Sequence, residues 1–211
     1  MTFTGFNASD FAVFSIPDFP SRMATLRAQI TPKLRDLGEE LLPAISKATG
    51  SVMHPHVALH IRRTTNPPEE TWVAFSPEKK SYKPFVHFRA GISAGKIRVT
   101  VFVEDYADEK EVFAKNLRSN SEDLTRYFTR HKEILGYSLL DDEGRPLFGA
   151  LLDSNKLRFL SDRLLYIKSM HAIFGIAIPE KRALAYGSGI TAQIVKAAKA
   201  LKPVYELGKR E

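Results

Sequence analysis

The hydrophobic pattern of residues 21–49 predicts a long amphipathic helix. Its apolar side chains recur at spacings of three and four residues, which places them along one stripe of a helix. These residues are Met23, Leu26, Ile30, Leu34, Leu37, Leu41 and Ile45. Pro32 and Pro43 should kink or divide the helix, because proline lacks a backbone donor and crowds the preceding turn. Gly50 should end it.

From residue 54 onward the pattern changes to a period of two. Val57, Leu59 and Ile61 alternate with more polar residues, which is typical of a strand with one buried face. Similar patterns follow at residues 71–76, 85–92 and 97–104. Because a parallel crossover needs about a dozen residues or more, the short connections here favour antiparallel neighbours.

The remaining segments alternate between helical and strand patterns. We expect helices at residues 10–14, 106–117, 119–130, 157–167 and 189–202, and strands at 134–140, 146–151 and 170–178. Asn7 or Ser9, Ser119 and Ser188 are the expected N-caps of the first, third and last of these helices. The order predicts an α+β fold, with helices packed on an antiparallel sheet of about six or seven strands. No linker divides the chain, so we expect a single domain over residues 1–211.

Composition removes several classes of function. The chain has 211 residues, 44% of them hydrophobic and 26% charged, as in ordinary globular proteins. It contains no cysteine, which excludes disulfides, cysteine nucleophiles, iron–sulfur clusters and cysteine zinc sites. The N-terminus has no signal-peptide pattern, and no apolar stretch approaches the roughly 18 residues of a membrane span. We therefore expect a cytoplasmic protein with no membrane association.

Positive charge is concentrated in one segment. Residues 54–103 hold eight basic and three acidic residues, so they carry +5 of the net +7. A field of this kind favours phosphates, carboxylates or nucleic acid. The alternative interpretation is a solubilising surface.

Within that segment, basic side chains come from several neighbouring strands and loops. If the strands are adjacent, side chains that share a face converge on one patch, where arginine binds phosphate or carboxylate through two hydrogen bonds and lysine adds a point charge. The candidate ligand-binding residues are His56, His60, Arg62, Arg63, Lys79, Lys80, Tyr82, Lys83, His87 and Arg89. His56, His60 and Arg62 are expected on one face of one strand.

Histidines near residue 54 also raise the question of a metal site. His54 and His56 would point the same way on a strand, about 6.6 Å apart, and two imidazoles can share a metal at that distance. A third ligand, such as His87 or Glu104, would have to come from elsewhere. Solvated polar residues are the better interpretation, so we predict no metal site and retain His54 and His56 only as weak candidates. The sequence leaves the cofactor unknown.

Two further features have ordinary structural explanations. Trp72 could stack on a flat ligand, but a lone tryptophan in an apolar strand is more often part of the core. Gly187, Ser188 and Gly189 precede a helix, where free amides can hold phosphate. They lack the lysine and spacing of a P-loop, so a capped helix start is the better interpretation.

Short blocks of distinctive sequence are distributed over nearly the whole chain. They are Phe3-Thr-Gly-Phe6, Pro32-Lys-Leu34, His56-Val-Ala-Leu-His60, Arg62-Arg63-Thr64, Asn66-Pro67-Pro68, Thr71-Trp72-Val73-Ala74-Phe75 and Pro203-Val-Tyr205. In these blocks the chain resembles the YktB-like family of uncharacterised bacterial proteins. The resemblance implies a compact α+β cytoplasmic protein and supplies no catalytic residues.

No motif of a known catalytic class is present, and whether the protein is an enzyme is left open. We find no nucleophile elbow, zincin motif, dinucleotide fingerprint or kinase motif. The favoured function is binding of a small anionic ligand on the basic segment. The alternatives are a histidine-dependent enzyme using His56 and His60, possibly with a metal, a nucleic-acid-binding protein, and a structural or protein-interaction role. The sequence does not indicate an oligomeric state.

Overall fold

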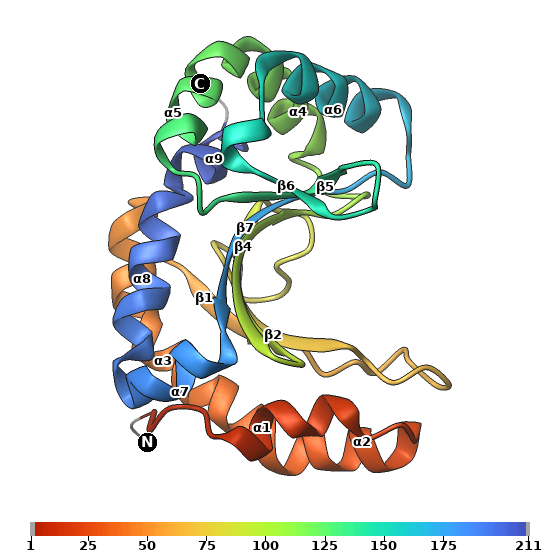
Figure 1. Ribbon diagram of the computed structural model, residues 1–211, viewed down its shortest axis with the longest axis vertical. Helices are drawn as coiled ribbons and strands as arrows, with labels where there is room; N and C mark the ends of the chain where they lie inside the picture. The colour runs from red at the N-terminus through yellow and green to blue at the C-terminus, as the bar shows by residue number, and fades with distance from the viewer. Residues whose placement is uncertain (1–2, 210–211) are drawn as a thin grey trace.

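A seven-stranded antiparallel sheet organises the fold (Figure 1). The computed structural model describes residues 3–209, so positions 1, 2, 210 and 211 of the expected domain lie outside the described residues. The spatial order of the strands is β1-β2-β3-β4-β7-β5-β6. They are β1 (His54–Val57), β2 (Glu70–Ser76), β3 (His87–Ser93), β4 (Lys96–Val103), β5 (Leu135–Leu140), β6 (Pro146–Phe148) and β7 (Ala172–Pro179). The predicted α+β fold and antiparallel sheet are confirmed.

Helices cover one face and both ends of this sheet (Figure 1). α3 (Thr31–Thr49) and α8 (Ile190–Ala200) lie against one face, with α7 (Glu180–Tyr186) near their lower end. α1 (Ala8–Ala12) and α2 (Phe19–Thr25) lie below the sheet. α4 (Lys110–Ser119), α5 (Ser121–Arg130) and α6 (Ser154–Tyr166) gather with β5 and β6 at the opposite end, and α9 (Lys202–Glu206) lies next to α5. Within residues 3–209, no helix combines the length and apolarity that crossing a bilayer would require.

The core lies between α3 and one face of the sheet. The predicted helical stripe is buried, with Leu34, Leu37 and Leu41 at most 1% exposed. Each such side chain stabilises the fold by about 1.5–3 kcal/mol. Gly38 allows the close approach, because a Cβ there would lie only 3.0 Å from Cγ2 of Val73 on β2.

The two prolines of the long helix have different effects. A π-helical turn at Leu26–Ile30 separates α2 from α3, and Pro32 follows it in the first turn of α3, where its missing N–H costs little. Pro43 lies inside α3 without ending it. Gly50 ends the helix in the left-handed conformation, with φ 69°, as predicted.

The strand predicted across residues 57–61 is shorter than its alternation indicates. The backbone N–H of Ala58 still donates to Trp72 O at 2.9 Å, but Arg63 N then donates to His60 O and closes a turn. His60 has a positive φ of 50°, and Ile61 is 77% exposed. The pairing therefore stops at Val57↔Val73, three residues before the start of β2 at Glu70, because the turn at His60 directs the chain away from its partner strand. The prediction that His56, His60 and Arg62 share one strand face is therefore wrong.

Helix starts show where short motifs mislead. Asn7 caps α1 as expected, and its Oδ1 accepts a hydrogen bond from Asp10 N at 3.1 Å. Ser119 belongs to the end of α4, and α5 begins without a side-chain cap. Ser188 lies in a short 3₁₀ turn after α7, a helix that the sequence patterns missed, and it caps nothing.

Candidate functional site

On the sheet face opposite α3, one arginine lies between two short side chains. Arg89 on β3 has Ala74 of β2 and Thr100 of β4 as its in-register neighbours. Because both neighbours are short, the guanidinium lies between aromatic rings, with Cζ 3.5 Å from the ring centroid of Phe102 and 4.5 Å from that of Trp72. We call this surface, formed by Trp72, Ala74, Arg89, Thr100 and Phe102, the basic face.

Arg89 is held by a hydrogen-bonded chain. Its terminal nitrogen forms an ion pair with Glu104, and its Nε donates to Nε2 of His87 at 2.9 Å. The His87 ring must therefore carry its proton on Nδ1, which donates to Phe85 O at 2.7 Å. Complete burial, with a smaller effect from Arg89, holds the pKa of His87 well below its ordinary value. These contacts fix the guanidinium and keep His87 neutral.

A cleft of about 550 Å³ lies between the basic face and the turn that follows β1. Its lining residues are Val57, Ala58, Leu59, His60, Ile61, Arg62, Arg63, Trp72, Tyr82, Lys83, Arg89, Phe102, Glu104 and Tyr106. Within residues 3–209, Arg62, Arg63 and Lys83 form no ion pair with a carboxylate. The one carboxylate in the lining, Glu104, is already paired with Arg89.

Two polar groups in the cleft wall lack a hydrogen-bond partner in the described part of the chain. They are Nε2 of His60 and Nε1 of Trp72, whose rings meet edge-on with centroids 5.3 Å apart. Burial, with a smaller contribution from Arg63, lowers the pKa of His60 to about 4, so His60 is neutral at pH 7. An unsatisfied buried group costs about 1–3 kcal/mol, so a hydrogen-bonding ligand in the cleft would offset part of this cost.

The structure brings six of the ten predicted ligand-binding residues together in this cleft. They are His60, Arg62, Arg63, Tyr82, Lys83 and Arg89. His87 and His56 lie behind Tyr82, with ring centroids 4.8 Å and 5.6 Å from its ring. Lys79 and Lys80 are exposed in the loop between β2 and β3 and do not line the cleft.

The cleft differs from the prediction in what is accessible to water. His87 and Arg89 are buried, at 0% and 8% exposure, so they do not form a solvent-exposed floor with the other cations. Trp72 is only half-buried and lines the cleft, so its assignment to the core is wrong. Phe102 was missed and Glu104 was considered only as a possible metal ligand, although the period of two along β4 places both on the face of Thr100.

The side chain of His56 on β1 has partners in the backbone and in a nearby serine. His56 Nε2 donates to Glu78 O at 2.8 Å and lies 3.2 Å from Ser76 Oγ. Burial lowers the pKa of His56. His54 pairs in register with Ser76. Residues 3–209 contain no group of three or more His, Asp or Glu side chains arranged to hold a metal ion.

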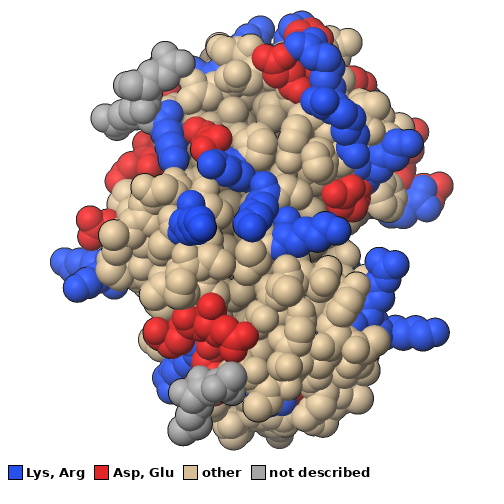
Figure 2. All heavy atoms as spheres, turned by 90° about the vertical axis from the view of Figure 1, so that its left-hand side faces the viewer, with Lys and Arg blue, Asp and Glu red and all other residues tan. Residues whose placement is uncertain are grey.

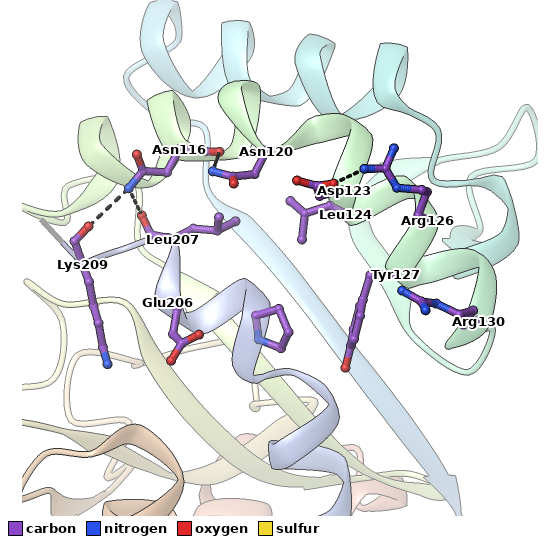
Figure 3. A pocket seen from close by; sticks show the side chains of 11 residues that line it. Asn116, Asn120, Asp123, Leu124, Arg126, Tyr127, Arg130, Glu206, Leu207 and Lys209 are labelled. Carbon is purple, nitrogen blue, oxygen red and sulfur yellow. Dashed lines mark hydrogen bonds and ion pairs between the residues drawn. The ribbon is translucent and has the colours of Figure 1, made fainter. Parts of the chain in front are cut away.

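A second cavity, of about 520 Å³, lies between the α4–α5 pair and the C-terminal residues (Figure 3). Asn116 Nδ2 donates to Leu207 O at 2.9 Å and to Lys209 O at 3.2 Å. Asp123 and Arg126 form an ion pair on the adjacent helix (Figure 3). These polar groups already form hydrogen bonds or ion pairs within the protein, and Asn116 binds the backbone of Leu207 and Lys209. The cavity is therefore a weaker candidate than the cleft at the basic face.

Comparison with known proteins gives a family and no activity. Residues 6–205 match the family described as "Domain of unknown function (DUF1054)". A UPF0637 protein of Bacillus velezensis is 34% identical over 185 residues, which cover 86% of this chain and 85% of that protein. A UPF0637 protein of Bacillus cytotoxicus is 32% identical over the full length of both chains, and one of Macrococcus caseolyticus is 31% identical over 97% of this chain and 100% of its own. The resemblance to uncharacterised bacterial proteins is confirmed, and the chain belongs to the DUF1054 family, whose relatives here carry the name UPF0637.

Proposed function

We propose that the protein binds a small anionic ligand, bearing phosphate or carboxylate, in the cleft between the basic face and the turn after β1. One observation carries this proposal: Arg62, Arg63 and Lys83 line one cleft, and none of them has a carboxylate partner within residues 3–209. Surface cations are usually solvated singly or paired, so three unpaired cations around one concave site favour an anion.

The charge balance of the lining supports the same ligand class. Four cationic side chains and one carboxylate line the cleft, which leaves three positive charges while His60 is neutral. Arg62 and Arg63 are exposed and have no carboxylate partner within residues 3–209, whereas Arg89 is fixed by Glu104 and His87. The exposed arginines would supply bidentate hydrogen bonds, and the fixed guanidinium would supply a permanent positive field.

The volume and the aromatic lining define the ligand further. A site of about 550 Å³ accommodates a small molecule and not a folded macromolecule. Trp72, Tyr82, Phe102 and Tyr106 supply apolar surface beside the cations. We therefore propose a compact anion with some apolar or planar surface. A location in the bacterial cytoplasm is part of this proposal, and cell fractionation would test it.

The test is ligand-induced stabilisation with a matched charge control. The melting temperature is measured with phosphate, pyrophosphate, citrate and nucleoside monophosphates, for the wild type, Arg62→Ala/Arg63→Ala, and Lys79→Ala/Lys80→Ala. At a ligand concentration of 100 times Kd, stabilisation should be about 2.7 kcal/mol. The arginine variant should lose the shift, while the lysine variant, which removes the same charge outside the cleft, should keep it.

The outcomes separate this proposal from its alternatives. If no anion raises the melting temperature, or if both variants lose the shift equally, the proposal fails. Loss in the lysine variant together with steep salt dependence would favour nucleic-acid binding. The histidine-dependent enzyme receives less support, because His56 does not line the cleft and its Nε2 already donates to Glu78 O, while His60 has a pKa of about 4, far from neutrality.

A further inference from the structure

β7 has an unpaired edge over its C-terminal half. On one side β4 pairs with all of β7, from Ala172 to Pro179. On the other side β5 pairs only at Leu135↔Gly175 and Gly136↔Phe174. Within residues 3–209, no strand pairs with the last four residues of β7 on that side.

The backbone groups at this edge point outward. Ile173 N donates to Ser138 Oγ of β5 at 2.9 Å, whereas Glu180 N donates to Gly95 O, next to β4, at 2.8 Å. Because successive residues of a strand direct their N–H and C=O groups to opposite sides, odd-numbered residues here face away from β4. Ala177 therefore directs its N–H and C=O, and Pro179 its C=O, toward the open edge.

A groove of about 680 Å³ runs beside this edge. Its floor is Ile176, Ala177 and Ile178, and α8 lies alongside β7 (Figure 1). The wall from α8 includes Ala197 and Ala200, whose short side chains leave room next to the strand. Tyr127 and His131 of the α5 end, together with Tyr186 of α7, complete an aromatic rim. The groove therefore borders the unpaired backbone groups of Ala177.

The rim of the groove is cationic. Arg182, Lys196 and Lys199 line it, and within the described part of the chain none of them forms an ion pair. The single carboxylate in the lining, Glu133, lies 3.4 Å from Nδ1 of His131. Lysine and arginine side chains gather across the face to which α8 contributes, while a group of acidic side chains lies lower on that face (Figure 2).

We propose that the open edge of β7 docks an extended acidic segment of a partner protein, which adds to the sheet as a further strand. Its backbone would pair with Ala177 and Pro179, and its Asp or Glu side chains would meet Lys196, Lys199 and Arg182. A second copy of this chain is disfavoured as the occupant, because pairing two β7 edges would bring two cationic rims together. This proposal is independent of the anion cleft, which lies on different elements.

The test uses a fluorescein-labelled peptide, acetyl-Glu-Val-Glu-Thr-Glu-Val-amide, followed by fluorescence anisotropy. It should bind the full-length protein saturably, and the matching peptide with Lys in place of Glu should not. A fully N-methylated version keeps the charge but cannot donate backbone hydrogen bonds. It should therefore bind at least about tenfold more weakly if strand addition occurs.

Variants of the protein separate charge from backbone pairing. Lys196→Glu/Lys199→Glu should weaken binding at least about tenfold, whereas Lys79→Glu/Lys80→Glu, with the same charge change elsewhere, should not. Ala177→Pro removes the outward N–H and leaves the pairing with β4 available, since proline is tolerated at such edge positions. It should also weaken binding.

Several results would overturn the proposal. They are equal binding of the N-methylated peptide, equal loss in the two lysine variants, or absence of binding to the wild type. Concentration-dependent dimerisation in sedimentation that Ala177→Pro abolishes would assign the edge to a second copy instead. If Ala177→Pro fails to fold by circular dichroism, the N-methylated peptide still decides the outcome.

Discussion

Arg89 donates a hydrogen bond from Nε to Nε2 of His87, 2.9 Å away on the same strand. This contact requires a neutral imidazole, because a protonated His87 would present a second donor to the guanidinium. The basic face therefore depends on a histidine that stays uncharged.

We expect the free energy of unfolding to decrease as the pH falls below about 6.5, the ordinary histidine pKa. Burial lowers the pKa of His87, His60 and His56 in the folded state, so between the two pKa values the unfolded chain binds more protons. Stability is then fully present above the unfolded pKa, and each histidine removes at most about 1.4 kcal/mol per pH unit below it. Urea titrations at pH 7.5, 6.5, 5.5 and 4.5 measure this slope.

His60→Asn provides the control for this pH dependence. Asparagine tolerates the positive φ of 50° at this position and does not titrate. The slope between pH 6.5 and about 4, the pKa of His60, should become shallower without disappearing, because His87 still titrates. An unchanged slope would mean that His60 does not have a lowered pKa.

Arg89→Ala should destabilise the protein by about 3–5 kcal/mol, because it leaves Glu104 without its cation in a partly buried site. The Arg89 and Glu104 side chains are 9% and 17% exposed. Arg89→Met/Glu104→Gln should recover part of the loss, since it removes both charges and retains apolar volume. A double-mutant cycle in urea, made of Arg89→Met, Glu104→Gln and the double variant, measures the coupling, and a coupling near zero would show that the pair contributes nothing.

Gly5→Ala should cost clearly more stability than Gly50→Ala. Both glycines have positive φ, 98° and 69°, which costs an alanine about 1–2 kcal/mol. At Gly5 the added Cβ would also lie 2.7 Å from the backbone carbon of Gly187, whereas at Gly50 nothing lies within 4 Å. Thermal melts compare the two, and equal losses would contradict the close contact between the N-terminal segment and the turn after α7.

Pro43→Ala should stabilise the protein by about 1–2 kcal/mol. Pro43 is exposed and lies inside α3, so alanine restores a helical hydrogen bond and removes a steric clash. Part of the gain of about 3 kcal/mol in helix propensity is offset by a more flexible unfolded chain. Pro32→Ala, in the first turn of α3, should give no gain. Chemical denaturation checks both variants, and a stabilised Pro32→Ala would contradict this account.

The sequence by itself determined most of the elements and part of the site. The α3 stripe, the period of two in β2 to β4, and the short connections were sufficient for an antiparallel α+β fold, because burial on one side of an element imposes a regular spacing. The clustering of basic residues near positions 54–103 also indicated which segment carries the positive field. Cations that stay exposed, such as Arg62 and Arg63, could be assigned to it by charge alone.

Only the tertiary structure decided which of these side chains meet. The strand pairing stops at Val57 although β2 continues to Glu70, because the chain turns at His60, and this turn places His60, Arg62 and Arg63 in the cleft beside the basic face. Arg89 is buried because its neighbours Ala74 and Thr100 are short and because Glu104 neutralises its charge. The open edge of β7 likewise has no signature along the chain, since it depends on where β5 leaves the sheet. Local spacing reports burial, whereas partners depend on which strands lie next to each other, and that information is distributed over residues far apart in the sequence.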